Sequence, residues 1–161
     1  MDVLFVNPGN ASGIYQNLAN SIAAVEPPTW ALLLAESARS RGFKVGILDV
    51  NAERLNINDA ADRIETINPR LVCFVVYGQN VNAGTVTMSG ATLLSNELKS
   101  RKTRLTICYV GSYVQALPKK VLKDEESIDF IFLNEGVYAL WNVLKLTSFE
   151  EEYLKTVNGI G

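Results

Sequence analysis

The stretch Leu71-Val72-Cys73-Phe74-Val75-Val76-Tyr77 decides the fold, because it is apolar almost throughout and is followed directly by glycine and amide residues. A strand whose side chains are apolar on both faces is typical of the middle of a parallel sheet. Four more short apolar stretches have the length of strands, at residues 2–7, 44–49, 105–110 and 129–133. Together with 71–77 they predict five strands.

Helical stretches are predicted between these strands. The first follows Pro27-Pro28, ends at Gly42 and has an inward apolar stripe at Trp30, Leu33, Leu34 and Ala38. The second has Asn58 as its N-cap and stops at Asn68-Pro69. Three more are expected, one starting between residues 81 and 89 and two over 118–122 and 136–144. This alternation predicts an α/β fold: a three-layer sandwich around a five-stranded parallel sheet with the flavodoxin-like strand order 2-1-3-4-5.

The composition indicates one domain with a buried core, since 48% of the 161 residues are hydrophobic and 20% are charged. The 15 basic and 17 acidic residues give a net charge of −2, so no binding of nucleic acid or of an anionic membrane is expected. The longest apolar run, 71–77, is far shorter than the roughly 18 residues of a membrane span. Residues 1–6 lack the features of a signal peptide. We therefore expect a cytoplasmic protein.

The sequence contains no histidine and only two cysteines. Without an imidazole the chain has no Ser-His-Asp triad, no Cys-His pair, no histidine zinc site and no histidine ligand for the metal of a porphyrin or corrin. Cys73 and Cys108 each lie inside an apolar stretch. Two lone thiols make neither a four-thiolate zinc site nor a self-contained iron–sulfur cluster, so we expect buried core thiols.

In a sheet of this order, ligands bind beyond the carboxyl ends of the strands. Four loops expected at that edge are rich in small and polar residues: Asn7-Pro8-Gly9-Asn10, Tyr77-Gly78-Gln79-Asn80, Gly111-Ser112-Tyr113 and Asn134-Glu135-Gly136. Amides both donate and accept hydrogen bonds, so these loops suit a ligand rich in carbonyl and amide groups. Each loop also has a purely structural explanation, as a connector or a helix cap. Asp49, at the end of the second strand, is placed to hold a ribose or a nucleotide tail.

Taken in order, the segments resemble the cobalamin-binding domain found at the front of many radical SAM enzymes. The resemblance covers Val3 to about Leu146, and its parts are Val3-Leu4-Phe5-Val6-Asn7-Pro8, Pro27-Pro28-Thr29, Leu33-Leu34-Ala35, Arg41-Gly42-Phe43-Lys44-Val45, Ile47-Leu48-Asp49, Asn68-Pro69, Val110-Gly111-Ser112, Ala116-Leu117-Pro118 and Asp129-Phe130-Ile131. Where that family has Gly-Gly and often Gly-Glu-Gly-Glu, this chain has Gly111-Ser112 and Asn134-Glu135-Gly136-Val137. The Asp-x-His-x-x-Gly signature of mutase-type cobalamin proteins is absent.

The resemblance implies a cobalamin over the carboxyl edge of the sheet, with no protein histidine on its cobalt. The side-chain amides of the corrin would meet Gln79, Asn80 and the backbone near Gly111, and the nucleotide tail would run toward the first and fifth loops. The chain has no Cys-x-x-x-Cys-x-x-Cys motif. The resemblance therefore places S-adenosylmethionine and an iron–sulfur cluster in a C-terminal radical SAM barrel that is missing here. Methyl transfer would be the commonest outcome in the full protein.

On this interpretation residues 1–146 are the cobalamin-binding domain and 147–161 begin a connector to the barrel. The chain alone would bind cofactor and catalyse nothing. Two alternatives stay open. Residues 35–49, a helix ending in Arg-Gly and a strand ending in Asp, also fit the N-terminal half of a two-domain glycosyltransferase. The departures at Gly111-Ser112 and Asn134-Glu135-Gly136 also fit a protein-interaction module without a ligand.

Overall fold

The computed structural model describes residues 1–9, 26–77, 81–101 and 104–161. They form one parallel sheet of five strands in the order β2-β1-β3-β4-β5, as predicted. The strands are β1 (Val3–Asn7), β2 (Val45–Asp49), β3 (Leu71–Val75), β4 (Thr106–Val110) and β5 (Phe130–Ile131). The order reverses between β1 and β3, because the chain passes to β2 on one side of β1 and to β3 on the other.

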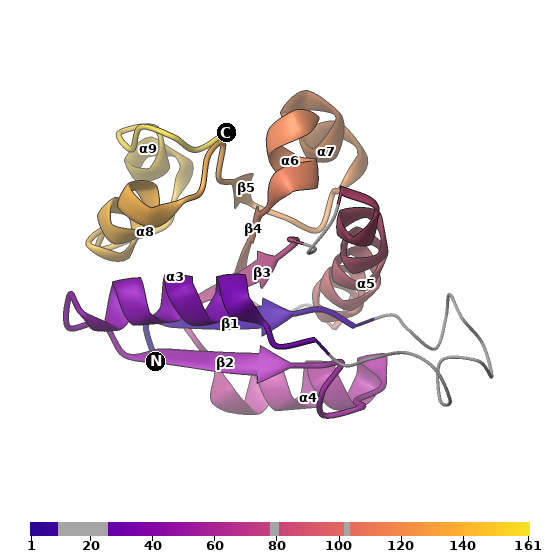
Figure 1. Cartoon of the computed structure of the whole chain (residues 1–161). Helices are drawn as coiled ribbons and strands as arrows, with labels where there is room; N and C mark the ends of the chain where they lie inside the picture. Colours follow the sequence, from indigo (N-terminus) through magenta and orange to yellow (C-terminus); the bar gives the residue numbers. More distant parts are fainter. Residues whose placement is uncertain (10–25, 78–80, 102–103) are drawn as a thin grey trace.

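Helices cover both faces of the sheet and complete the predicted three layers (Figure 1). One face carries α3 (Thr29–Arg39), α8 (Val137–Leu144) and the short α9 (Glu151–Leu154). The other carries α4 (Ile57–Ile67), α5 (Val81–Ser100), α6 (Ser112–Ala116) and α7 (Pro118–Asp124).

The central strand β3 is buried at all five positions, which explains its continuous apolar sequence. Its side chains alternate between the two cores. Cys73 and Val75 face α3 and α8, whereas Val72 and Phe74 face α4 and α5. Cys108 is the register partner of Cys73 on β4, and both thiols are free and buried as predicted.

The fifth strand is shorter than predicted, because β5 contains only Phe130 and Ile131 instead of residues 129–133. The C-terminal end of the chain lies along its outer side in the antiparallel direction. The N–H of Ile131 donates to the carbonyl of Gly161 (2.9 Å), and the N–H of Leu133 donates to the carbonyl of Gly159 (2.9 Å). Residues near the C-terminus thus form part of the packed domain.

Three helix predictions need correction. Asn56, not Asn58, is the N-cap of α4, and its side-chain oxygen accepts the N–H of Asp59. Trp30 and Leu33 of α3 are exposed, because the helix packs on the sheet through the smaller side chains of Ala31, Ala35 and Ala38 together with Leu34. The short helix α6 was expected to be a loop.

In the part of the chain that the structure describes, no helix is long and apolar enough to cross a membrane. The same residues contain no cluster of three metal-binding histidine, cysteine, aspartate or glutamate side chains.

Candidate functional site

The carboxyl ends of the strands all lie on one edge of the sheet, because the strands are parallel. This edge carries the described parts of the four predicted loops, at residues 7–9, 77, 111–113 and 134–136. The predicted contacts Asn10, Gly78, Gln79 and Asn80 lie outside the described residues. The first turn of α3 reaches the same edge, since α3 ends only a few residues before β2 begins.

After β1, the loop is tied to the end of β2. The side-chain amide of Asn7 donates to a carboxylate oxygen of Asp49 (3.0 Å), and the same oxygen accepts the N–H of Ala52 (3.0 Å). Pro8 is buried, and Gly9 lies so close to Asn51 that a Cβ there would be 2.8 Å from its Cα. Asn7 and Asp49 therefore hold each other and shape the edge between β1 and β2.

After β4, the chain passes very close to the end of β3. A Cβ on Gly111 would lie 2.0 Å from the carbonyl oxygen of Val76, so only glycine fits. Protein backbone thus accounts for this glycine without any ligand. Ser112 then begins α6 with its side chain exposed, and Tyr113 is partly buried against the core on the α5 side.

After β5, a tight turn leads into α8. The side chain of Asn134 accepts the N–H of Gly136 (2.9 Å), and Gly136 adopts the left-handed conformation at φ +80°. Asn134 and Glu135 remain exposed. The turn therefore presents a carboxylate and an amide at the edge beside the start of a helix.

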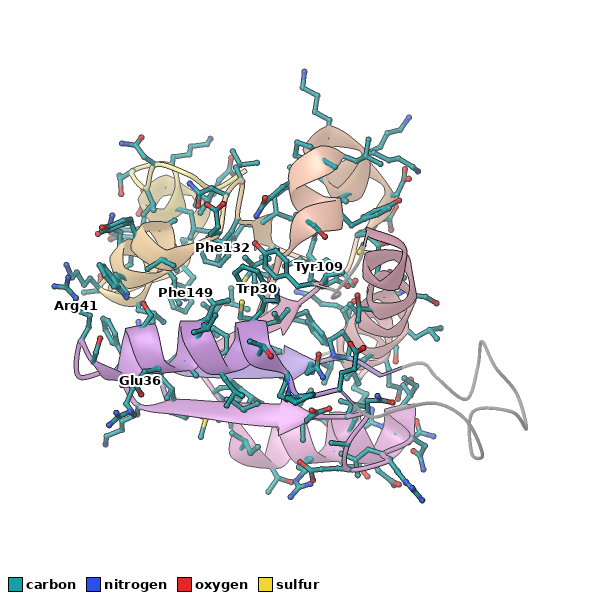
Figure 2. The ribbon with its side chains drawn as sticks, viewed as in Figure 1. Trp30, Glu36, Arg41, Tyr109, Phe132 and Phe149 are labelled. Atoms are coloured by element: carbon teal, nitrogen blue, oxygen red, sulfur yellow. The ribbon has the colours of Figure 1, made fainter. Side chains whose placement is uncertain are left out.

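Tyr77 brings three elements together at the middle of the edge. Its ring stacks on Trp30 of α3, with ring centroids 4.4 Å apart and planes 21° from parallel. Its hydroxyl oxygen accepts a hydrogen bond from the side-chain amide of Gln115 in α6 (2.7 Å). Burial raises the pKa of the Tyr77 phenol, and the negative charge of Glu135 raises it further. Figure 2 shows Trp30 pointing from α3 toward the middle of the molecule.

The sequence does not predict a place in the site for Trp30 or Gln115. Its apolar pattern predicts Trp30 in a buried stripe, whereas the residue is 41% exposed. The signal that could have found it is its position two residues after Pro28, in the first turn of a helix that begins at the carboxyl edge. For Gln115 there was no signal, because the helix that carries it was not predicted. The described edge thus offers two aromatic faces, side-chain amides, a hydroxyl and one exposed carboxylate.

Comparisons with known proteins agree with this architecture. The family model of the B12 binding domain matches residues 16–144. The fold is similar to that of the radical S-adenosylmethionine methyltransferase TsrM from Kitasatospora setae, solved with cobalamin and a 4Fe-4S cluster bound, with a TM-score of 0.71 and 16% identity over 99% of this chain. It is also similar to the cobalamin-dependent S-adenosylmethionine radical enzyme OxsB, solved with aqua-cobalamin and S-adenosylmethionine bound, with a TM-score of 0.68 and 19% identity over 99% of this chain.

At these identities the two likenesses show the fold alone. The chain spans 29% of the length of TsrM and 20% of the length of OxsB. Among curated proteins, no sequence matches this chain.

Proposed function

Because this chain belongs to the B12-binding domain family, we propose that it holds a cobalamin over the carboxyl edge of its sheet. The observation that carries the proposal is the match of the family model to residues 16–144, which extends over most of the domain. The contacts we assign are the four loops predicted from the sequence: Asn7 to Asn10, Tyr77 to Asn80, Gly111 to Tyr113 and Asn134 to Gly136.

The residues present at this edge fit such a ligand. A corrin is a broad ring fringed with carboxamides, so it needs an open surface and groups that pair with amides. The exposed side chains of Ser112, Asn134 and Glu135 offer hydrogen-bond donors and acceptors at this edge. When bound, cobalamin supplies a cobalt centre that can carry a methyl group. The chain itself binds and orients the ring.

With no histidine in the chain, the cobalt receives no imidazole from this domain. The affinity therefore comes from amide hydrogen bonds, backbone groups and apolar contact. No histidine side chain is present to make binding depend on pH near neutrality.

We also propose that the domain works within a longer cytoplasmic radical SAM protein. A barrel carrying S-adenosylmethionine and an iron–sulfur cluster would face the corrin, and methyl transfer is the reaction we assign to the pair. Support comes from the similar fold in TsrM and OxsB, each of which is several times longer than this chain.

Mixing the purified domain with hydroxocobalamin, followed by desalting, tests the binding proposal. We expect the visible absorption of the corrin to elute with the protein, with a changed spectrum. A colourless protein fraction and an unchanged corrin spectrum in a direct titration would show that the proposal is wrong.

A pair of matched variants tests the location. Ser112→Trp places a bulky indole on the carboxyl edge, whereas Ser40→Trp places one just after α3, near the opposite edge, and both serines are exposed. We expect Ser112→Trp to weaken binding at least about tenfold, because it fills space the ring needs, and Ser40→Trp to bind as the unmodified chain does. Equal affinities would place the cobalamin elsewhere.

A further inference from the structure

Trp30 is an unusual residue for a helix that packs on a sheet. Its large apolar side chain is 41% exposed, while α3 makes its core contacts through Ala31, Leu34, Ala35 and Ala38. Burying apolar surface stabilises a protein by about 25 cal/mol for each Å², and the exposed part of an apolar side chain does not contribute this stabilisation. The contacts that α3 makes with the sheet therefore do not account for the exposed part of this indole.

The indole is nevertheless held in place. It stacks on the half-buried ring of Tyr77, and Gln115 fixes the Tyr77 hydroxyl through a hydrogen bond of 2.7 Å. Three elements thus converge on one aromatic pair: α3, α6 and the end of β3. An aromatic surface that is already ordered loses little conformational entropy when a ligand packs against it.

We propose that the Trp30–Tyr77 pair is a preformed platform on which an apolar face of the bound cobalamin rests, and that it determines the specificity of the site for a large flat ligand. This rests on the function proposed above. Trp30 and Tyr77 lie where the strand order reverses between β1 and β3. A ring system stacks or packs well on an aromatic face, whereas a small anion gains nothing from it. In a chain without histidine, such contact takes the place of cobalt coordination in holding the ring.

The test compares Trp30→Ala, Trp30→Phe and Trp141→Phe by titration with hydroxocobalamin followed in the visible spectrum. Trp141 is the matched control, because it is the only other tryptophan and its indole is fixed away from Tyr77, between the hydrogen bond to Ser37 and the guanidinium of Arg41. We expect Trp30→Ala to raise the Kd roughly tenfold or more, in the range of aromatic anchors at binding sites. Trp30→Phe should restore affinity to within about threefold, because a phenyl face keeps the packing. Trp141→Phe should leave the Kd unchanged.

Urea unfolding of each variant separates binding from folding. Because Trp30 is 41% exposed but stacks on Tyr77, we expect Trp30→Ala to remain folded with a midpoint modestly below that of the unmodified chain. Gln115→Ala, which frees the Tyr77 hydroxyl but keeps both rings, should raise the Kd less than Trp30→Ala does.

If Trp30→Ala is folded and binds cobalamin as tightly as the unmodified chain, the platform proposal is wrong and the proposed function stands. A loss that Trp30→Phe does not restore would also overturn it, since the aromatic face would then not be what matters. If the unmodified chain itself binds no cobalamin, the proposed function fails and the platform fails with it.

Discussion

Gly111 occupies a point where the ends of β3 and β4 are bound together. The N–H of Val76 donates to the carbonyl of Val110 (2.7 Å), and a methyl group on Gly111 would lie 2.0 Å from the Val76 carbonyl oxygen. We predict that Gly111→Ala lowers the free energy of unfolding by about 3 kcal/mol or more, because the backbone must move apart at the centre of the sheet. Urea denaturation measures the loss.

Gly42 provides the control for this substitution. It also has a positive φ, +87°, but a Cβ there would meet no atom within 4 Å. We expect Gly42→Ala to cost only about 1–2 kcal/mol, from the backbone conformation alone. Similar losses for the two variants would contradict the steric explanation for Gly111.

The buried phenol of Tyr109 should make the free energy of unfolding fall at high pH. Its buried hydroxyl lies 2.6 Å from that of Ser95, which in turn lies 2.7 Å from that of Ser127, and burial raises its pKa. The unfolded chain therefore releases this proton first, near pH 10. The contribution to stability is complete below pH 10 and is lost as the pH rises above it.

We expect the free energy of unfolding to fall between pH 10 and 11 and to fall less steeply in Tyr109→Phe, as measured by urea denaturation at each pH. The raised pKa of Tyr77 acts in the same direction, so some decline should remain in the variant. Identical slopes for the two proteins would contradict the role of Tyr109.

The sequence could predict buried residues only where burial is dictated by the strand pattern. Cys73 and Cys108 were correctly predicted because each is surrounded by apolar strand residues. Trp30 and Leu33 were not, because residues 30–35 are apolar at every position and several helix faces are equally hydrophobic. The sheet selects the face rich in alanine, since small side chains let the helix approach the strands closely.

The start of α4 offers a direct comparison of two asparagines. Asn56 caps the helix through the N–H of Asp59 (2.9 Å), whereas Asn58 is exposed inside the first turn. We predict that Asn56→Ala lowers the free energy of unfolding by about 1 kcal/mol and that Asn58→Ala changes it by less than about 0.5 kcal/mol. Thermal or urea denaturation of the two variants checks this, and the reverse order would assign the cap to Asn58.

Elements could be predicted where a periodic pattern was long enough. All five strands lie within two residues of their predicted bounds. The helix α6 is only five residues long, too short to show a periodic pattern, so Gln115 and its contact with Tyr77 were not foreseen. Which asparagine caps α4 depends on how the chain turns after β2. In that turn the N–H of Leu55 donates to the carbonyl of Val50, a contact that the local sequence does not indicate.

Residues 147–161 pack against the domain that precedes them. They remain our proposed connector to a further domain, yet Leu154 and Val157 are buried in the core beside α8, and the last residues lie along β5. We predict that a chain ending at residue 146 loses at least about 3 kcal/mol of unfolding free energy, because two buried apolar side chains and the cover of β5 are removed.

Urea denaturation of the shortened chain measures this loss. Point variants separate the contributions: Leu154→Ala should cost about 2–3 kcal/mol, whereas Tyr153→Ala, at an exposed position, should cost much less. If the shortened chain were as stable as the full one, residues 147–161 would not contribute to the stability of the domain.

The sheet order followed from alternation and handedness, which leave few arrangements for five parallel strands. The pairing of residues 159–161 with β5 could not be predicted, because it depends on main-chain hydrogen bonds from a Gly-Ile-Gly segment. The stacking of Trp30 on Tyr77 could not be predicted either, because the two residues are 47 positions apart in the sequence.

Cys73 and Cys108, register partners on the adjacent strands β3 and β4, allow the opening of the sheet to be followed by thiol labelling. A thiol-specific reagent reaches both sulfurs only when β3 and β4 separate from the core. The labelling rate in native buffer therefore reports how often this opening occurs. Since both sulfurs belong to one face, a single opening uncovers them together. With the reagent concentrated enough to react faster than the strands close, a mass spectrum taken partway through the reaction should show chains with two adducts or none. A build-up of singly labelled chains under that condition would show that the two strands open separately.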